Sequence, residues 1–428
     1  MIALVVASVV DISIVKINDL VDKYFIPLQG KLTLFAVNSS VCLVLQFFLI
    51  RYIQGSFQGD RTLKVKAIYT ISIISLCILA SLIGFLTFQQ FYNNYYDTSI
   101  SIAIITISYG TATGLLIWLS SLFLSWYRSS HDLIVLLYSI SISIIAFNLI
   151  MTAAFAIAKV NDKPRLAGEY VGSSGDVSGR KHLLVDYTYR ISTFMSFFSI
   201  WMTTAILMNY YREKLINAII YWIVLFIPLI YFIISYFYQV ILGSILISVV
   251  RIDPITVSIV LGAFLSLSKP IGGLLFGIVF WNISRIIGYE RNIKIYMIIS
   301  GWGILLIFSS NQAVTQIISP YPPFGLVTIT ILTTASSLML LGIYNSAALV
   351  SANNELRRSI HRHALESKLL GAIGHAEMEK EIQRTVKQVA RDKDELEKEL
   401  EEPVELDEME LEKYIEFVVN EVRKGSRH

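Results

Sequence analysis

Lys269 is the residue whose type and position could most readily do chemistry in this sequence. It lies near the middle of a long apolar run and is followed directly by Pro270. Ionisable side chains at membrane depth are costly and often face a cavity or a ligand. Three roles fit: contact with an anionic ligand or substrate, a Schiff base to a chromophore, or bonding to the carbonyls that Pro270 leaves free. The predicted spans contain no Asp or Glu as a counter-ion, which argues against the chromophore.

Neutral polar and small residues complete the candidate sites. Asn282, further along the same run, joins Lys269 and Pro270 as a candidate for contact with a ligand or a pore. Small residues four positions apart let membrane helices approach closely. Intramolecular packing is the expected role of these glycines, and a broken helix that lines a site is the alternative. The glycines concerned are Gly110, Gly114, Gly272, Gly273 and Gly277.

The sequence lacks common catalytic and nucleotide-binding motifs. It has no His-Glu-x-x-His, no Gly-x-Ser-x-Gly, no phosphate loop and no dinucleotide fingerprint. Its two cysteines, Cys42 and Cys77, lie inside apolar runs, and its histidines form no cluster of ligands. The surroundings of His375 lack the His-Glu and proline pattern of sensor kinases. We therefore expect no catalytic residues, no cofactor and no metal site, and no concentrated basic surface suggests nucleic-acid binding.

The composition indicates an all-α bundle of transmembrane helices. Of the 428 residues, 55% are hydrophobic and only 16% are charged, whereas soluble domains average about 25% charged residues. About 20 apolar residues span a bilayer as a helix. Nine segments meet that requirement: 32–50, 65–88, 99–126, 133–158, 191–210, 215–240, 255–281, 295–308 and 326–350.

The distribution of basic residues predicts the orientation. Lys or Arg follows the first, third, fifth, seventh and ninth spans, whereas 89–98 and 311–325 contain neither. Connections rich in Lys and Arg stay in the cytoplasm. The chain is therefore predicted to be a multi-pass protein of the cell membrane, with its N-terminus outside and its C-terminus in the cytoplasm.

Three parts follow from this topology. Residues 1–31 form an outer segment, in which 1–16 are predicted to be an interfacial or half-inserted helix because the stretch is short and carries Asp11. Residues 32–351 form the bundle, and its outer loop 159–190 is rich in Gly and Ser, which predicts a mobile loop. Residues 352–428 form a charged tail with 14 basic and 19 acidic residues.

The tail has the periodicity of amphipathic helices. Ile382, Val389 and Leu396 recur every seven residues, as in a coiled coil. After Pro403, a second apolar stripe consists of Leu411, Ile415, Val418 and Val422. These stripes predict self-association or a protein partner. At the junction with the bundle, Arg357, Arg358 and Arg362 are expected to contact anionic lipid head groups.

Two stretches resemble a group of archaeal multi-pass membrane proteins with charged C-terminal tails. One is Pro-Ile-Gly-Gly-Leu-Leu-Phe-Gly at 270–277 with Phe280 and Trp281. The other runs from Pro-Pro-Phe-Gly at 322–325 through Ser-Lys-Leu-Leu-Gly-Ala-Ile-Gly at 367–374 to Met-Glu-Lys-Glu-Ile at 378–382. Some members of the group are similar to the membrane input modules of sensory proteins. The resemblance implies the topology above and supplies no catalytic residues.

We expect a sensory or signal-transducing membrane module that acts through its tail. The run from 326 to 400 has little Gly or Pro, so a movement of the ninth span could pass into the tail. A transporter or channel with Lys269 near the permeation route is the alternative, and a scaffold subunit of a membrane complex comes third.

Overall fold

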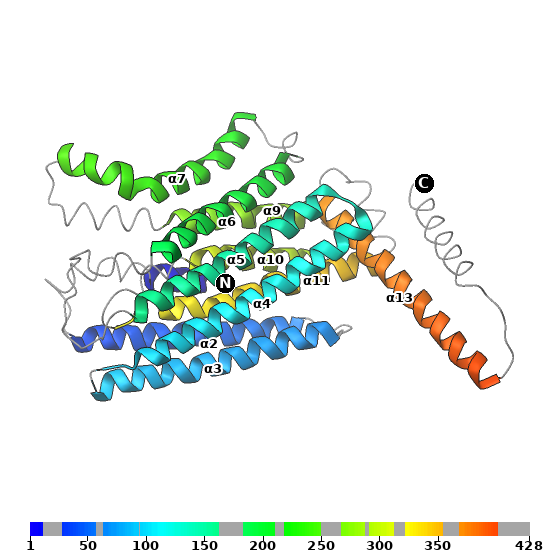
Figure 1. Cartoon of the computed structure of the whole chain (residues 1–428), viewed down its shortest axis with the longest axis horizontal. Helices are drawn as coiled ribbons and strands as arrows, with labels where there is room; N and C mark the ends of the chain where they lie inside the picture. Colours follow the sequence, from blue (N-terminus) through cyan, green and yellow to red (C-terminus); the bar gives the residue numbers. More distant parts are fainter. Residues whose placement is uncertain are drawn as a thin grey trace.

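The computed structural model describes residues 1–11, 28–56, 63–93, 95–161, 183–209, 218–249, 267–286, 291–311, 322–353 and 368–400. These residues form a bundle of long helices from which one helix, α13, projects (Figure 1). Consecutive helices run in alternating directions, as short connections between membrane spans require. We call the end of the bundle that carries α13 the tail end, and the opposite end the far end.

Ten long helices make up the described chain. Seven of them are long and apolar enough to cross a membrane, which supports a multi-pass membrane protein in contact with lipid. The nine spans stay a prediction, because parts of α7 and of the predicted seventh span lie outside the described side chains. The helices are α2 (Leu28–Ser56), α3 (Leu63–Asn93), α4 (Thr98–Ser130), α5 (Leu133–Asn161), α6 (Leu183–Asn209), α7 (Ala218–Val249), α9 (Ser268–Ile286), α10 (Arg291–Ser310), α11 (Leu326–Ala352) and α13 (Lys368–Leu400).

Helix α11 forms the centre of the bundle. It contacts α2, α3, α4, α10 and α13, and its apolar window is buried throughout. Gly325 precedes the helix as its N-cap, and its φ of 87° is a left-handed conformation that favours glycine. Because Pro322 and Pro323 fix the chain just before it, the start of α11 is held in one direction.

Glycines bring three neighbouring helices into close contact. A Cβ atom at Gly277 of α9 would lie 2.8 Å from the carbonyl oxygen of Gly301 in α10. A Cβ atom at Gly303 of α10 would lie 2.7 Å from the backbone nitrogen of Met339 in α11. The backbones of α9, α10 and α11 therefore touch in succession, which is the geometry that small residues permit in membranes.

Helix α7 lies at the edge of the bundle and curves along its length (Figure 1). Pro228 lies inside it, and a proline removes a backbone hydrogen bond and bends the helix around it. Helix α7 contacts α9 and only slightly α6. Its outward residues, among them Ile223 and Ile227, are exposed apolar side chains.

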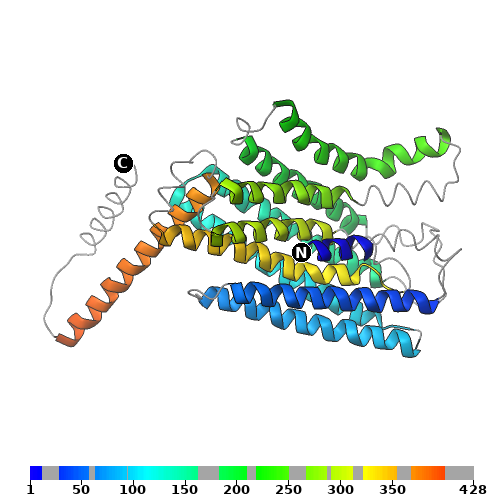
Figure 2. The ribbon, with the colours of Figure 1, turned by 180° about the vertical axis from the view of Figure 1, so that it is seen from behind.

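Residues 2–11 form a short apolar helix at the far end, which Figure 2 places beside the start of α11. Leu4, Ala7, Ser8 and Asp11 are buried, whereas Ile2 is exposed. One face of this helix therefore packs on the bundle and the other faces outward. An interfacial or half-inserted helix was predicted here, and its position relative to a membrane stays a prediction.

The start of helix α6 differs from the sequence prediction. Helix α6 already begins at Leu183, so the last part of the predicted loop 159–190 is helical. Oδ2 of Asp186, in the first turn of α6, lies 3.0 Å from Nε of Arg190 one turn later. This ion pair and the negative charge near the helix N-terminus both stabilise the start of α6. Residues 162–182 lie outside the described chain, and so does the mobility predicted for them.

Helix α11 does not continue into the tail. It ends at Ala352, and Asn353 is extended with φ −110° and ψ 109°. The uninterrupted run expected from 326 to 400 is therefore wrong, because the backbone leaves the helix at Asn353. Helix α13 instead packs sideways on α11 and α4 before it projects from the bundle (Figure 1).

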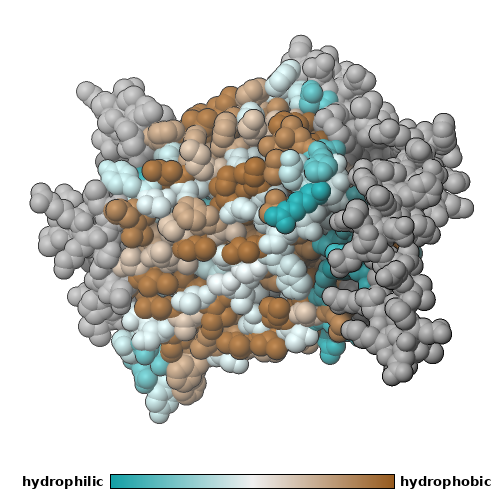
Figure 3. All heavy atoms as spheres, turned by 45° about the vertical axis from the view of Figure 1, so that its right-hand side comes forward, coloured by the Kyte–Doolittle hydropathy of each residue, from teal (hydrophilic) through white to brown (hydrophobic). Residues whose placement is uncertain are grey.

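Figure 3 shows one face of the molecule, on which apolar and weakly polar side chains predominate among the described residues. Large exposed apolar side chains occur on α2, α3, α6 and α7, among them Phe48, Phe88, Met202 and Ile227. Such a surface suits hydrocarbon rather than water.

Candidate functional site at the base of the tail helix

The first turns of α13 pack into the tail end of the bundle. Leu369, Leu370, Ile373 and Ala376 are buried and recur every three to four residues, so they share one face of the helix. A Cβ atom at Gly374 would collide with the side chain of Val350 in α11. Helix α13 therefore lies directly against the end of the central helix.

Two buried carboxylates attach this part of α13 to α4. Glu377 is only 6% exposed, and its Oε2 accepts a hydrogen bond of 2.7 Å from Nε1 of Trp126. Oε2 of Glu379 accepts from the hydroxyl of Ser129, one turn further along α4. Because a buried carboxylate without donors is costly, these bonds fix the register between α13 and α4.

Basic side chains lie beside the carboxylates. Nε2 of His375 lies 3.4 Å from Oε1 of Glu379, and Nζ of Lys380 donates to the hydroxyl of Ser125 at 2.8 Å. Burial lowers the pKa of Lys380, while the carboxylate of Glu377 raises it and Arg384 lowers it. Glu377 thus helps to keep a partly buried lysine charged beside it.

Lys64, at the start of α3, completes this cluster. Its ammonium group lies 5.3 Å from the ring centroid of Tyr344 in α11, a cation–π distance. We call Trp126, Ser129, Lys64, Glu377, Glu379 and Lys380 the tail-base cluster. It joins α3, α4, α11 and α13, so a displacement of any of these helices changes contacts in it.

The far end of α11 is held by a third buried carboxylate. Oδ2 of Asp11 accepts from the backbone nitrogens of Gly325 and Thr328, at 3.0 and 3.3 Å, and from the hydroxyl of Thr328 at 2.5 Å. A carboxylate at this position satisfies the free N–H groups of a helix start and interacts favourably with the helix dipole. The side chain of Asn38 in α2 also interacts with this carboxylate.

Polar side chains along α11 bond to its neighbours between these ends. Gln46 of α2 donates to Thr330 at 3.1 Å and accepts from Thr334 at 2.8 Å. The hydroxyls of Ser72 in α3 and Ser337 lie 2.6 Å apart. Hydrogen bonds of this kind fix the rotation of a helix within a membrane bundle.

A separate buried network joins α4, α5, α6 and the end of α10. Asn148 donates to Ser192 and Thr193, both at 3.0 Å, and accepts from Asn311 at 2.8 Å. Tyr109 donates to Asn311 at 3.4 Å. Because both polar atoms of the Asn148 amide have partners, the network holds helices together without an evident vacancy for a ligand.

The predicted ligand or pore residues do not come together. Lys269 lies half-buried in the first turn of α9, and Pro270 beside it is buried. Asn282 lies thirteen residues further along the helix, which is about 20 Å along its axis. Among the described residues no hydrogen bond or ion pair of Lys269 is found, and its neighbours at 250–266 lie outside the description.

The predicted packing glycines divide into two groups. Gly272, Gly273 and Gly277 lie against Phe197, Leu305 and Gly301, respectively. Gly110 and Gly114 have nothing within 4 Å of an added Cβ atom and do not make the helix contact expected of them. Their spacing is that of a packing motif, but that face of α4 points away from the neighbouring helices.

The predicted tail residues are only partly described. Ile382 lies half-buried in α13, and Val389 and Leu396 belong to the same helix. Arg357, Arg358 and Arg362 lie outside the described residues, and so do Leu411, Ile415, Val418 and Val422. Their roles in binding lipid head groups or in the interaction of the tail stay predictions.

The sequence analysis did not identify the residues that attach α13 at one end of the bundle or those that cap α11 at the other. Trp126 and Glu377 are 251 positions apart, and Asp11 and Gly325 are 314 apart, so no local pattern joins them. One signal was available: Glu377 follows the apolar positions 369, 370 and 373 on one helical face, which makes it a candidate for burial.

No protein-family model, no curated protein and no solved structure matches this chain. Within the described residues, no group of His, Cys, Asp and Glu could hold a metal ion. The case for function therefore depends on the geometry of the chain itself.

Proposed function

We propose that the protein is a signal-transducing membrane module whose output is the position of its tail helix. The observation that carries the proposal is the hydrogen bond between Glu377 of α13 and Trp126 of α4, buried at the base of the tail. It couples a charged helix outside the predicted membrane region to the ends of the spanning helices. A tail joined only by a flexible linker would have no such contact.

Helix α11 is the element proposed to carry the signal. Asp11 holds its far end, and the side chains of Val350 and Tyr344 meet α13 and Lys64 at its tail end. Because packed helices shift between discrete arrangements rather than deform continuously, a change at one end can be felt at the other. The coupling is therefore lateral packing between two helices, not one continuous helix.

The test is to break the far end and to observe the tail. In the full-length protein in lipid nanodiscs, amide hydrogen exchange is measured over 368–380 before and after Asp11→Ala. Loss of the cap frees the start of α11, so we expect exchange in α13 to rise several-fold although the tail itself is unchanged. Gly110→Ala, on a lipid-facing part of α4, is the matched control and should leave the tail protected.

The interpretation depends on where exchange changes. Protection of α5 and of α6 must persist in Asp11→Ala, which separates coupling from global unfolding. Unchanged exchange over 368–380 in a folded Asp11→Ala protein would contradict transmission through α11. Glu377→Ala gives the reference for a tail that has lost its bond to Trp126.

A transporter or channel is the second candidate, and the unpaired state of Lys269 among the described residues favours it. A lysine at membrane depth without a partner often marks a substrate or ion path. Lys269→Met should then abolish solute flux into vesicles without lowering the yield of folded protein. Equal flux through both proteins would remove this candidate, and a scaffold subunit without transport would remain as the third.

The proposed setting follows from the same arrangement. The protein would lie in the cell membrane with its N-terminus outside and its tail in the cytoplasm, where a protein partner or a second copy would bind α13. It would need no catalytic residues and no cofactor. Labelling of single cysteines from either side of sealed vesicles tests this orientation.

A further inference from the structure

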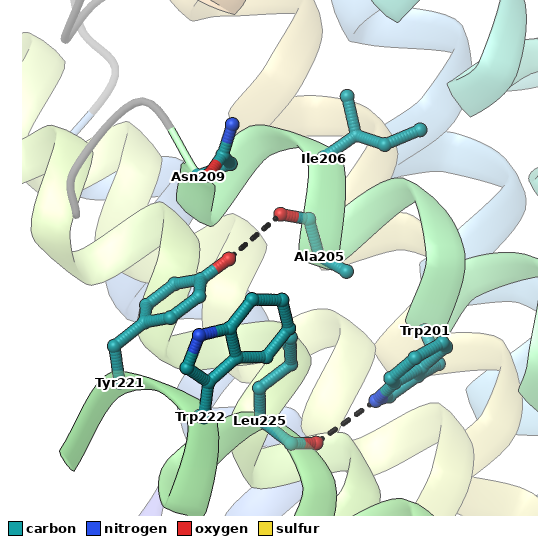
Figure 4. A pocket seen from close by; sticks show the side chains of 7 residues that line it. All are labelled: Trp201, Ala205, Ile206, Asn209, Tyr221, Trp222 and Leu225. Carbon is teal, nitrogen blue, oxygen red and sulfur yellow. Dashed lines mark hydrogen bonds between the residues drawn. The ribbon is translucent and has the colours of Figure 1, made fainter. Parts of the chain in front are cut away.

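A crevice of about 410 Å³ opens between the last turns of α6 and the first turns of α7 (Figure 4). Its volume falls in the range of ordinary small-molecule sites, roughly 300–1,000 Å³. The lining residues are Trp201, Ala205, Ile206 and Asn209 from α6 and Tyr221, Trp222 and Leu225 from α7. The walls are therefore aromatic and aliphatic, with the amide of Asn209 as a polar group.

Two polar side-chain groups of the walls already have hydrogen-bond partners. Nε1 of Trp201 donates to the carbonyl oxygen of Leu225 at 2.9 Å, and the hydroxyl of Tyr221 donates to that of Ala205 at 3.2 Å. Figure 4 shows these two bonds on either side of the ring of Trp222. They bridge α6 and α7 and leave apolar ring faces as the surface offered to a ligand.

Pro228 accounts for the space between the two helices. It lies three residues after Leu225, so the backbone of α7 bends just beyond the crevice. The ring of Trp222 stacks on Phe226 with centroids 5.5 Å apart, and Phe226 in turn contacts Trp201 at 5.6 Å. Phe226 thus connects the two tryptophan rings by aromatic contact.

The crevice opens onto the surface that faces lipid. Trp222 is 47% exposed, and its chain neighbours Ile223 and Phe226 on α7 are exposed apolar side chains. Whatever enters between α6 and α7 must therefore come from the hydrocarbon layer around them. Polar solutes would have to cross that layer to reach the same walls.

We propose that the α6–α7 crevice is a specific binding site for a bilayer lipid. One hydrocarbon chain lies between the rings of Trp201 and Trp222, and the polar head group lies toward Asn209, near the membrane surface where Trp and Tyr are favoured. Apolar contact with flat aromatic faces supplies the affinity. Lipid binding here does not depend on the role of the tail.

The experiment uses the full-length protein in phosphatidylcholine vesicles that contain a small fraction of phosphatidylcholine with a diazirine in its acyl chain. After illumination, the adducts are mapped by peptide mass spectrometry. We expect the segments around Trp201 and Trp222 to be labelled about tenfold more than equally exposed residues of α3. Such a ratio corresponds to about 1.4 kcal/mol of preferential binding.

Two matched substitutions on α6 test the location. Ala205→Phe fills the crevice and should reduce its labelling to the level of α3. Met202→Phe changes a lipid-exposed position one turn away and should leave the labelling high. Labelling spread evenly over the lipid-facing helices of the unmodified protein would overturn the site, whether or not the variants fold, and so would undiminished labelling in a folded Ala205→Phe protein.

Discussion

Helices α11 and α7 are both strongly apolar, but α11 lies at the centre of the bundle and α7 at its edge. Helix α11 is buried throughout, capped by Asp11 and bonded to α2, α3 and α4 along its length. Helix α7 is exposed on its outer side, bent at Pro228 and held to α6 by two side-chain bonds to carbonyls.

The difference concerns what hydrophobicity can specify in a membrane. Lipid is as apolar as leucine, so hydrophobicity alone does not favour a central position of a membrane helix over one in contact with lipid. Small residues and hydroxyl groups place α11 at the centre, because they allow close approach and directed bonds. Bulky aromatic residues leave α7 at the edge, where it can accommodate a ligand.

The largest effect should come from a methyl group between α10 and α11. Gly303→Ala places a Cβ atom 2.7 Å from the backbone of Met339, which cannot move aside as a side chain would. We expect a loss of about 1–3 kcal/mol of stability, measured as a lower thermal midpoint of the monodisperse protein. Gly110→Ala has open space and should gain about 0.5–1 kcal/mol, since alanine favours the helix. Equal midpoints for the two variants would contradict the close approach of α10 and α11.

Removing the cap of α11 ranks next. Asp11→Ala leaves the N–H groups of Gly325 and Thr328 buried without an acceptor, a cost of about 1–3 kcal/mol. Asp97 caps α4 in the same way, through Ser99 at 2.9 Å, but on an exposed surface where water can replace it. Asp97→Ala should therefore cost less, about 1 kcal/mol. A larger loss at Asp97 than at Asp11 would show that burial does not strengthen the cap.

A smaller effect is expected from the polar bonds within the bundle. Gln46→Leu removes the bonds to Thr330 and Thr334 while keeping a similar volume. Interhelical hydrogen bonds in membranes contribute about 0.6 kcal/mol on average, and up to about 1.7. Reversible unfolding in mixed micelles resolves such a change, and a loss well above that range would mean that Gln46 also positions α11 by packing.

The smallest change in stability should occur on α7. Pro228→Ala restores a backbone hydrogen bond and straightens the helix, and neighbouring groups already compensate for the proline in membranes. We expect a change below about 1 kcal/mol, together with weaker lipid labelling around Trp222 because the crevice narrows. A large loss of stability would show that the bend of α7 is part of the core.

The sequence predicted the helices better than the contacts between them. Runs of about 20 apolar residues indicated the helices because bilayer thickness fixes their length. The central position of α11 was not predictable, since its hydropathy is similar to that of α2, which is far more exposed. The tail-base cluster escaped for another reason: Glu377 resembles any glutamate on a charged helix until Trp126 is placed beside it. The glycine pairs show the same limit, because equal spacing occurs on a packed face at 273–277 and on an open face at 110–114.

The bond between Asp11 and α11 has a consequence for biosynthesis. The first helix of the chain leaves the ribosome more than 300 residues before Gly325 and Thr328 are made. At about 5–20 residues per second, that interval is on the order of tens of seconds. During this time the carboxylate has no helix to cap and must stay in water or at the membrane surface. Translation of α11 therefore sets the moment at which residues 2–11 can dock on the start of this helix.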